Sequence, residues 1–336
     1  MPVTRAAAPE FVVTRGLAPR GLAPGAITIG NFDGVHRGHQ AMLARTIAAA
    51  RERGLVARVL TFEPHPRELF APATAPTRLT SLREKLELLG AHGVDHVHVQ
   101  RFSRAFASLA PEAFVEQALV GLLAARWVLV GEDFRYGARR AGDLAALAAD
   151  AARHGFELAA MPTVSDGGTR VSSSAVREAL ARGELARAAA LLGRPYSISG
   201  RVVHGTKLGR ALGFATANVQ LKHNRPPLGG IFAVRVRGAG AGPGAGAGAG
   251  PGAGAGAGDR PRDGVASLGV RPTVHADGRP VLEVHLFDFA GDLYGRHLQV
   301  EFLAKIRDEA RYPDLDTLKA QIARDCDSAR ALLTAH

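Results

Sequence analysis

The sequence is poor in the residues that build disulfide frameworks and thiolate metal clusters. Its 336 residues include one cysteine, Cys326, which lies in a C-terminal helical pattern where an inert thiol is expected. One cysteine can form neither an intramolecular disulfide nor a zinc site of several thiolates, so both are excluded. A catalytic cysteine is not favoured either.

Long apolar runs and aromatic residues are also scarce. No apolar stretch approaches the roughly 20 residues of a membrane-spanning helix, so we expect no membrane partner. The first 25 residues contain four prolines and scattered arginines but no apolar core of a secretory signal, so the expected location is the cytoplasm. Aromatic residues make up 6% of the chain and supply no stacking platform for nucleic acid.

The chain carries an excess of positive charge. Lys and Arg number 42 against 31 Asp and Glu, which gives a formal net charge of +11. The basic residues are mainly arginines, and they are dispersed among alanines rather than clustered with aromatic residues. This pattern indicates anionic substrates and leaves nucleic-acid binding as a minority hypothesis.

The chain is long enough for two domains, and the first half has the pattern of an α/β fold. Short apolar runs lie at 26–31, 55–62, 94–100, 127–131 and 156–161, with helical patterns near 38–53, 81–92, 111–124 and 143–154 between them. This alternation predicts a parallel sheet with helices on both faces. Ligands of such sheets bind at the carboxyl ends of the strands.

From Arg194 onward the pattern changes to short, glycine-rich strands. Apolar runs lie at 196–204, 231–237, 265–270, 282–288 and 297–302, and helical periodicity returns at 314–333. Closely spaced strands with glycine turns predict a small antiparallel β-barrel with a C-terminal helix. We therefore expect a partly disordered extension at 1–25, a first domain at 26–192 and a second domain at 195–336.

Residues 238–258 contain only Gly, Ala and Pro, with glycine at every second position. Collagen requires glycine at every third position, so this insert is not collagen-like. Pro243 and Pro251 interrupt any cross-β stacking of the Gly-Ala repeat. We expect a disordered loop between two strands, without a functional role.

Residues 30–39, GNFDGVHRGH, stand between the first expected strand and the first expected helix. A glycine turn in this context directs backbone N–H groups and the positive end of the helix dipole to one point, where an anion can bind. His36 and His39 are three residues apart, so they share a face of the first helical turn. Two imidazoles at a helix N-terminus suit a triphosphate whose α-phosphorus is attacked.

Three later segments lie at corresponding places in the pattern. Residues 61–66, TFEPHP, end the second strand, and the two prolines around His65 make a stiff loop. Residues 131–137, GEDFRYG, follow the fourth strand. Residues 171–177, VSSSAVR, precede a helix, and their hydroxyl groups and Arg177 suit phosphate oxygens.

Together these segments resemble the adenylyltransferase module of prokaryotic bifunctional riboflavin kinase/FAD synthetases, in which the decapeptide corresponds to the HxGH signature of nucleotidylyltransferases. The resemblance covers 26–192 and implies a Rossmann-like nucleotidylyltransferase domain. It implies that the phosphate of FMN attacks the α-phosphorus of ATP and expels pyrophosphate, with Mg²⁺ bridging phosphate oxygens. Such a reaction needs positioning and charge stabilisation rather than a side-chain nucleophile.

The resemblance also implies roles for single residues. It makes His36 and His39 the catalytic pair, which contact the triphosphate together with Asn31, and it adds Asp33 to the nucleotide site. Ser173, Ser174 and Arg177 would contact the leaving pyrophosphate. Asp133 and Phe134 would lie near the adenosine, and Pro64 and Pro66 would form a wall beside the flavin.

A second resemblance lies in the β-rich half. Residues 209–218, GRALGFATAN, are similar to the G-x-x-L-G-F-P-T-A-N segment of riboflavin kinases, and the sequence has no GxxxxGK[ST] segment. In that family the Thr and the Asn hold Mg²⁺ and the nucleotide phosphates, which implies these roles for Thr216 and Asn218. Gly209 and Gly213 would let the backbone approach phosphate closely.

Residues 282–288, LEVHLFD, alternate like a strand and place Glu283 and His285 on one face. The similarity to the E-x-H segment of riboflavin kinases implies that Glu283 is the base for the ribityl 5′-hydroxyl group. The resemblance extends from 195 to about 333. One residue departs from it: Ala215 replaces the usual proline, so the loop before Thr216 is less pre-organised and the kinase can be weakened.

The sequence therefore predicts an enzyme that makes FMN from riboflavin and ATP, and then FAD from FMN and ATP. Two alternatives stay open. A nucleotidylyltransferase for another phosphorylated acceptor explains the HxGH signature but leaves the second domain without a role. The other is a basic RNA-binding protein with an OB-like barrel, but the barrel of this sequence lacks the aromatic platform that such a protein needs. Whether the chain forms a homo-oligomer is also left open.

Overall fold

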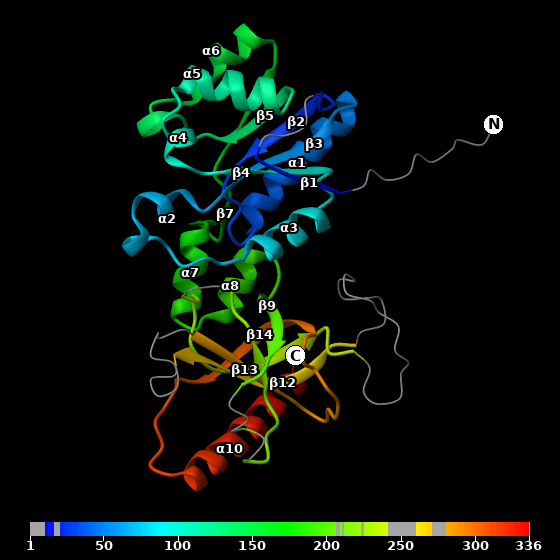
Figure 1. Cartoon of the computed structure of the whole chain (residues 1–336), viewed down its shortest axis with the longest axis vertical. Coiled ribbons are helices and arrows are strands. Elements are labelled where there is room, and N and C mark those ends of the chain that lie inside the picture. Colours follow the sequence, from blue (N-terminus) through cyan, green and yellow to red (C-terminus); the bar gives the residue numbers. More distant parts are fainter. Residues whose placement is uncertain are drawn as a thin grey trace, which may run out of the picture. The chain divides into compact units, whose positions relative to one another are not determined.

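The computed structural model describes residues 11–16, 21–205, 209, 212–222, 225–240, 260–270 and 280–335. The chain divides into two compact units (Figure 1). The first comprises Met1–Pro76 with Leu82–Ser172, and the second comprises Thr77–Ser81 with Ser173–His336.

The first unit contains a six-stranded, wholly parallel sheet, which confirms the predicted α/β class. The strand order is β1-β4-β3-β2-β5-β6. The strands are β1 (Val12–Arg15), β2 (Gly25–Ile29), β3 (Val56–Glu63), β4 (His96–Arg101), β5 (Ala125–Gly131) and β6 (Glu157–Met161), followed by a small hairpin of β7 (Ser165–Asp166) and β8 (Thr169–Arg170). From β2 the chain continues outward to β3 on one side, and β5 lies on the other, so the strand order reverses at β2.

Helices cover both faces of this sheet. They are α1 (Arg37–Arg53), α2 (Pro66–Phe70), η1 (Pro72–Thr74), α3 (Leu82–Ala91), α4 (Arg104–Ala107), α5 (Pro111–Phe114), the π-helical η2 (Val115–Leu122), η3 (Ala138–Arg140) and α6 (Leu144–His154). On one face, Ile27, Ile29 and Val128 pack with residues of α5, η2 and α6. On the other, Val59 and Val97 pack with residues of α1 and α3. Burial on both faces explains why the central strands β2 and β5 are mainly apolar.

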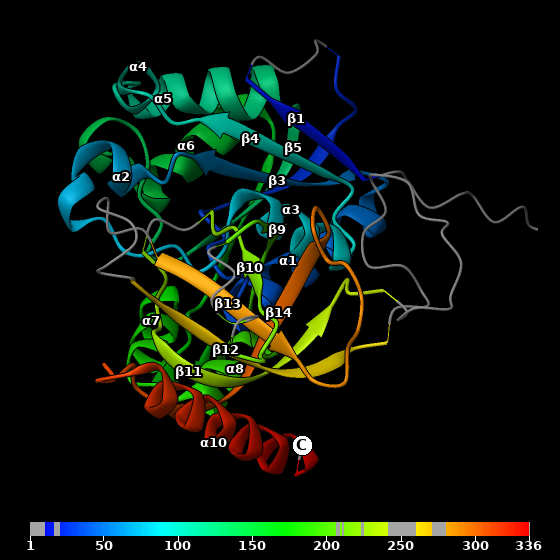
Figure 2. The ribbon, with the colours of Figure 1, turned by 60° about the horizontal axis from the view of Figure 1, so that its bottom comes forward.

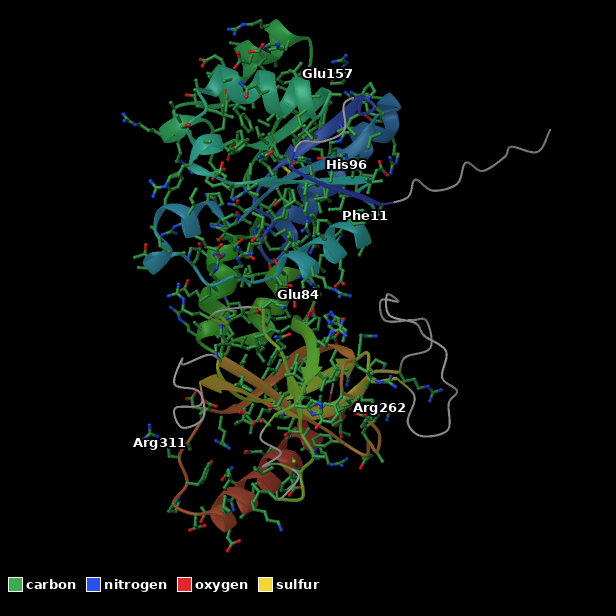
Figure 3. The ribbon with its side chains drawn as sticks, in the orientation of Figure 1. Phe11, Glu84, His96, Glu157, Arg262 and Arg311 are labelled. Atoms are coloured by element: carbon green, nitrogen blue, oxygen red, sulfur yellow. The ribbon has the colours of Figure 1, made fainter. Side chains whose placement is uncertain are left out.

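Strand β1 was not predicted, because residues 1–25 were assigned to an N-terminal extension. It pairs in parallel with β4, and a buried polar chain attaches it there. Arg58 Nε donates to His96 Nδ1 (2.7 Å), so the proton of His96 is on Nε2 and is donated to Thr14 Oγ1 (2.7 Å). The Thr14 hydroxyl then donates to His98 Nδ1 (2.9 Å). These hydrogen bonds fix His96 and His98 as neutral tautomers (His96 is labelled in Figure 3).

The polar chain requires that His96 stay neutral. Burial, followed by the positive charge of Arg58, lowers the pKa of His96 to about 4, and burial also lowers the pKa of His98. A second proton on His96 Nδ1 would face the Arg58 N–H group instead of accepting from it. Protonation of His96 in acid therefore weakens the attachment of β1 to the sheet.

We expect the first unit to lose stability in mild acid because of His96. Its pKa is about 6.5 in the unfolded chain and about 4 in the fold. Between these values the unfolded chain binds more protons, so the free energy of unfolding falls by roughly 3 kcal/mol from pH 7 to pH 4. Urea unfolding followed by the fluorescence of Trp127, the single tryptophan, measures this in the first unit. His96→Gln should flatten the pH dependence, and an unchanged slope in that variant would contradict the assignment.

The second unit contains a closed antiparallel barrel in the order β10-β13-β12-β11-β14-β9, which confirms the predicted barrel (Figure 2). Its strands are β9 (Tyr196–Val203), β10 (Ala217–Val219), β11 (Gly230–Arg237), β12 (Arg262–Val270), β13 (Pro280–Leu286) and β14 (His297–Arg307). Helices α7 (Ser173–Ala181) and α8 (Leu185–Leu192) precede the barrel, and α10 (Leu315–Thr334) ends the unit. Cys326 and Ala329 of α10 pack on Ala233 of β11 and Val265 of β12. Burial raises the pKa of the Cys326 thiol to about 11.

The domain boundary and the Gly/Ala/Pro insert were also predicted. Helices α7 and α8 belong to the second compact unit, whereas the predicted first domain, 26–192, includes them. The predicted disordered insert lies outside the described residues from 241 onward. Among the helices of the described ranges, none combines the length and the apolarity needed to cross a membrane.

Candidate functional sites

The decapeptide forms the turn between β2 and α1, at the carboxyl edge of the sheet where the strand order reverses. Its backbone is compact, with positive φ at Phe32 (49°), Gly34 (82°) and Val35 (42°). The Asn31 carbonyl accepts a hydrogen bond from Thr61 Oγ1 of β3 (3.2 Å). Asp33 is buried in the turn. This is the place in a doubly wound sheet where ligands bind.

His36 and His39 lie face to face at the start of α1. Their rings are stacked with centroids 3.7 Å apart. His36 is the N-cap, and its Nδ1 accepts from the backbone N–H of His39 (3.3 Å), so the ring proton of His36 is on Nε2. Burial holds the pKa of His39 well below its usual range, and the nearby His36 and Lys85 lower it further. His39 is therefore neutral at pH 7.

Two polar atoms of this site lack partners within the described residues. Asn31 Oδ1 and His39 Nδ1 are both buried and make no hydrogen bond. A buried polar atom without a partner costs about 1–3 kcal/mol, so such atoms are explained best by a ligand or an ordered water. The helix N-terminus, the two imidazoles and these two atoms together form a site suited to a polar anion.

Gly38, the glycine of the HxGH signature, is required by close packing. A Cβ at this position would lie 3.2 Å from the His36 ring and 3.5 Å from the carbonyl oxygen of Val171. The backbone at Val171 therefore lies beside the start of α1, and the run Ser172–Ser174 follows directly in the chain.

Ser173, Ser174 and Arg177, the predicted pyrophosphate contacts, lie on helix α7 of the second unit. There Arg177 Nε donates to the carbonyl oxygen of Thr77 (2.6 Å). The hydrogen bond holds the guanidinium group through one nitrogen. The grouping of these three residues with His36 and His39 remains a prediction.

The TFEPHP segment forms the junction between β3 and α2. The Glu63–Pro64 peptide is cis, and Pro66 occupies the first turn of α2. The His65 side chain accepts from the backbone N–H of Arg67 (3.2 Å), and Glu68 accepts from the His65 backbone (3.1 Å), so the short helix is capped. Pro64 and Pro66 are thus held in a defined loop at the carboxyl edge.

An aromatic cluster lies at the same edge, and sequence analysis did not identify it. Neighbouring rings have centroids 5.4–6.0 Å apart, and the members are Phe62, Phe70, Phe102, Phe106, Phe114, Phe134 and Tyr136. These rings come from strand ends and loops that are distant in sequence, so no short motif contains them. Phe134, predicted near the adenosine, stacks on Tyr136. Its neighbour Asp133 is exposed and pairs with Arg170 (2.6 Å).

The barrel brings the residues of the second predicted site together. Glu283 on β13 lies directly opposite Asn218 on β10 and Ser267 on β12. The residues that alternate with them are buried in the barrel, so this polar row faces outward. Thr216 comes two residues before Asn218. Directly opposite residues have Cβ atoms about 4.5–5.5 Å apart, so the row forms one polar surface.

Glycines let the neighbouring loops approach this row. A Cβ at Gly205 would overlap the amide group of Asn218, and one at Gly209 would lie 2.9 Å from Thr216 Oγ1. Gly213 has a φ of 90°, which favours glycine. These observations support close packing of the backbone around Thr216 and Asn218.

His285 compensates in part for the alanine at position 215. Its Nδ1 donates to the carbonyl oxygen of Ala215 (2.8 Å), and its ring packs edge-on against Phe214 (5.6 Å). The carbonyl can only accept, so Nδ1 carries the proton. The loop before Thr216 is thus anchored to the strand of Glu283 without the proline.

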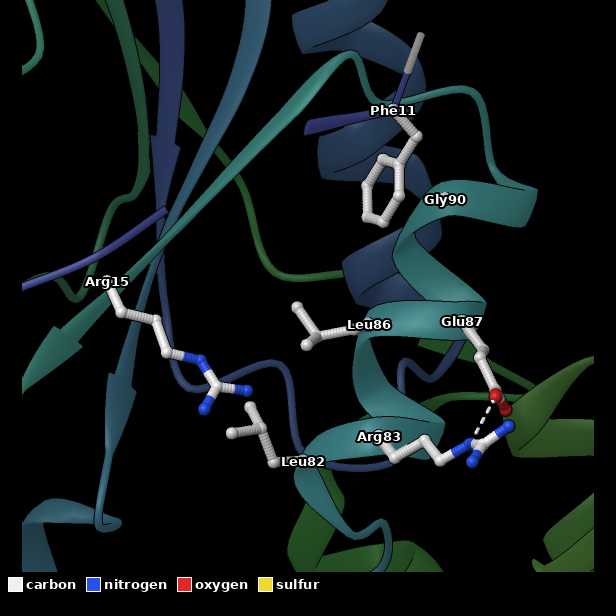
Figure 4. Close-up of a pocket in the computed structure, with 7 residues that line it drawn as sticks. All are labelled: Phe11, Arg15, Leu82, Arg83, Leu86, Glu87 and Gly90. Atoms are coloured by element: carbon white, nitrogen blue, oxygen red, sulfur yellow. Dashed lines mark hydrogen bonds and ion pairs between the residues drawn. The ribbon is translucent and has the colours of Figure 1, made fainter. Parts of the chain in front are cut away.

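A further cavity of about 620 Å³ lies between β1 and α3 (Figure 4). Its walls are mainly apolar, with Arg15 on one side and the Arg83–Glu87 ion pair (2.7 Å) on the other. Phe11 lies over Gly90, where a Cβ would be 3.4 Å from the ring. None of the predicted site residues lines this cavity.

Comparison with known proteins agrees with both predicted domains. The FAD synthetase family model matches residues 19–175, and the riboflavin kinase model matches residues 192–333. A bifunctional riboflavin kinase/FMN adenylyltransferase of Escherichia coli K12 is 50% identical over 304 residues, which cover 90% of this chain and 91% of that protein. Relatives of the same description from Pseudomonas fluorescens and Haemophilus influenzae are 47% and 43% identical, covering 91% and 94% of this chain and 92% and 97% of their own.

A solved structure supports the same fold over the whole chain. It is described as a macrolide-efflux protein from Streptococcus pneumoniae, and it is 27% identical with a TM-score of 0.75. The match covers 95% of this chain and 98% of that one. With two family models in order and relatives matched over nine-tenths of their length, this chain belongs to the family of bifunctional riboflavin kinase/FMN adenylyltransferases.

Proposed function

We propose that this chain phosphorylates riboflavin to FMN on its barrel and adenylylates FMN to FAD in its first unit, with ATP as the donor in both steps. The observation that carries the proposal is that each family match contains one polar site with the donors that its reaction requires. The stacked His36–His39 pair lies in the first match, and the row around Glu283 lies in the second.

In the adenylyl transfer, an oxygen of the FMN phosphate attacks the α-phosphorus of ATP, and the bond to pyrophosphate breaks. The N-terminus of α1 and the Nε2–H of His36 donate to the phosphate oxygens on which negative charge increases. His39 is neutral, so it donates a hydrogen bond from its single N–H group without carrying a positive charge. Asn31 orients the triphosphate, and Ser173, Ser174 and Arg177 are proposed to hold the leaving group.

The flavin of this step is proposed to lie against the aromatic cluster. Offset or edge-to-face packing of aromatic rings contributes about 0.5–1.5 kcal/mol per pair beyond area burial. Pro64 and Pro66 form the adjoining wall, because they lie in the capped loop that follows β3. The Asp133–Phe134 segment, at the end of β5, is proposed to lie beside the adenosine.

In the kinase step, the 5′-hydroxyl oxygen of riboflavin attacks the γ-phosphorus of ATP, and ADP leaves. Glu283 takes the proton of that hydroxyl group. Thr216 and Asn218 supply neutral oxygens to the nucleotide phosphates, and the backbone at Gly209 lies close to them. The outward orientation of the row leaves it accessible to both substrates.

The donor set of the barrel fits Mg²⁺ bound together with ATP. The described residues contain no group of three or more His, Cys, Asp or Glu side chains arranged to hold a metal ion. Thr216 and Asn218 supply two hard oxygen ligands, and Mg²⁺ commonly takes its other ligands from phosphates and water. When bound, the ion neutralises phosphate charge during transfer.

We further propose that the chain acts in the cytoplasm on small molecules, namely riboflavin, FMN and ATP, without a nucleic-acid partner. Its arginines are dispersed, and the aromatic cluster of the first unit lies beside the predicted flavin site rather than along a basic groove.

Incubation of the purified chain with riboflavin, ATP and Mg²⁺, followed by chromatography of the flavins, tests this proposal. We expect FMN to appear first and FAD to accumulate afterwards. FMN without FAD would restrict activity to the barrel and favour a different acceptor in the first unit. Absence of both products would refute the proposed function.

A further inference from the structure

The loop that joins β5 to α6, residues 132–143, is held firmly at its base. Tyr136 and Gly142 exchange two backbone hydrogen bonds (3.1 and 3.0 Å), and the Ala138 N–H donates to the carbonyl oxygen of Leu109 (2.7 Å). A Cβ at Gly142 would lie 2.7 Å from Cζ of Tyr136, so the ring rests directly on that glycine. The loop therefore leaves the carboxyl end of β5, the strand next to β2, and its tip is held against Leu109 and Pro111.

The tip carries two consecutive residues in an unfavourable backbone conformation. Arg139 and Arg140 have φ angles of 53° and 60°, in the left-handed region that residues with a Cβ rarely adopt. Such strain persists only where the surroundings impose it, and it concentrates at binding and catalytic sites. Glycine would occupy both positions without strain, so the arginine side chains are retained at a cost to the fold.

Neither guanidinium group has a partner in the part of the chain that the structure describes. Both side chains are exposed, and no ion pair or hydrogen bond is present for either. Other arginines of this region are paired: Arg135 with Asp143 (3.2 Å) and Arg170 with Asp133. Two unpaired cations are therefore presented side by side on a fixed loop.

A buried hydroxyl group lies at the base of the same loop. Tyr136 is 6% exposed, and its hydroxyl oxygen has no hydrogen-bond partner among the described residues. Its Cζ, which carries the hydroxyl, is the ring atom nearest to Gly142. Desolvation raises the pKa of Tyr136 to about 12, so the group remains a hydrogen-bond donor at neutral pH.

We propose that Arg139 and Arg140 bind the phosphate of the flavin substrate in the adenylyl transfer. This inference rests on the proposed function, because it assigns the acceptor's phosphate to one loop of the same site. Tyr136 of the same loop belongs to the aromatic cluster against which the flavin is proposed to lie, so one segment offers an aromatic ring and two cations to a ligand made of an aromatic ring and a phosphate. The triphosphate of ATP is already proposed to bind at the N-terminus of α1, where His39 is neutral.

Replacement of both arginines by glycine separates charge from backbone strain. For Arg139→Gly with Arg140→Gly we expect the KM for FMN in FAD formation to rise about 10- to 100-fold, the loss expected for charged hydrogen bonds to phosphate. The KM for ATP and the rate of riboflavin phosphorylation should change less than about twofold. The thermal midpoint should not fall, because glycine relieves the strain. Arg139→Lys with Arg140→Lys should keep part of the affinity.

Two controls make the result specific to the phosphate. Lumiflavin has the flavin ring without the ribityl phosphate, so its inhibition constant against FMN should be the same in the parent and the glycine variant. Arg126→Ala removes an exposed arginine at the amino end of β5, opposite the carboxyl edge, and should change neither KM. An unchanged KM for FMN in the glycine variant, or a rise in its KM for ATP instead, would overturn the inference. If the parent protein still forms FAD, the proposed function stands. Failure of the parent to form FAD would reject that function itself.

Discussion

Replacement of Glu283 by glutamine is expected to abolish the formation of FMN from riboflavin and to leave the conversion of FMN to FAD intact. Glutamine keeps the shape of the side chain but cannot take the proton of the ribityl 5′-hydroxyl group. Loss of a general base costs about 10²- to 10⁴-fold in rate. The side chain lies on the outward row of the barrel between Asn218 and Ser267, so the change does not disturb the barrel interior. Initial rates with riboflavin and with FMN, measured separately, give the comparison.

A second carboxylate of the same barrel provides the matched control. Glu301 on β14 pairs with Arg237 (3.1 Å) and is not part of the row around Glu283. Glu301→Gln should retain both activities. Loss of both activities in a folded Glu283→Gln protein would contradict two independent sites, and undiminished FMN formation would remove Glu283 from the role of base.

Replacement of His36 by alanine is expected to have the converse effect, with loss of FAD formation and retention of riboflavin phosphorylation. The variant loses the Nε2–H donor and the ring on which His39 stacks at 3.7 Å. Removal of one such donor to a developing negative charge costs about 10²- to 10³-fold in rate. It also removes the N-cap of α1, which contributes about 1 kcal/mol to stability. Rates from FMN and ATP, together with thermal unfolding, measure the two effects.

Asparagine at position 36 separates these two effects. It is among the best N-cap residues, so His36→Asn should restore the thermal midpoint that the alanine variant loses. It supplies no imidazole, so FAD formation should stay low. Full activity of His36→Asn would show that His36 acts only as a helix cap. Equal loss of FMN and FAD formation in either variant would contradict the assignment of His36 to the adenylyl transfer alone.

Most of the sheet and the barrel could be predicted because their strands have strong local patterns. Every residue of β2 is buried, and the sequence there is a continuous apolar run. Strand β1 has no such pattern: its four residues are mostly exposed, and Thr14 is held by two histidines more than 80 residues away. Strand β10 has only three residues in a glycine-rich stretch, and its place depends on pairing with β9 and β13. Tertiary contacts decide both strands, so neither was predicted.

The sites divide in the same way. The turn with His36 and His39 could be predicted because the residues are contiguous and precede a helix. The row of Asn218, Glu283 and Ser267 depends on strand register, which motifs suggested but periodicity alone could not give. The aromatic cluster depends on tertiary proximity. The left-handed arginines were unforeseen because arginine gives no reason to expect that conformation. The roles of single residues and the boundary at 192–195 stay predictions.

The division of the chain into units affects the order in which the protein can fold during synthesis. Thr77–Ser81 belongs to the second unit, where the Thr77 carbonyl accepts from Arg177, a residue made 100 positions later. At about 5–20 residues per second, the ribosome needs roughly 5–20 s to reach that partner. Strand β3 and helix α3, on either side of this segment, can meanwhile join the first unit. The first unit can therefore fold during synthesis before Thr77–Ser81 makes its contacts, because helix α7 is synthesised later.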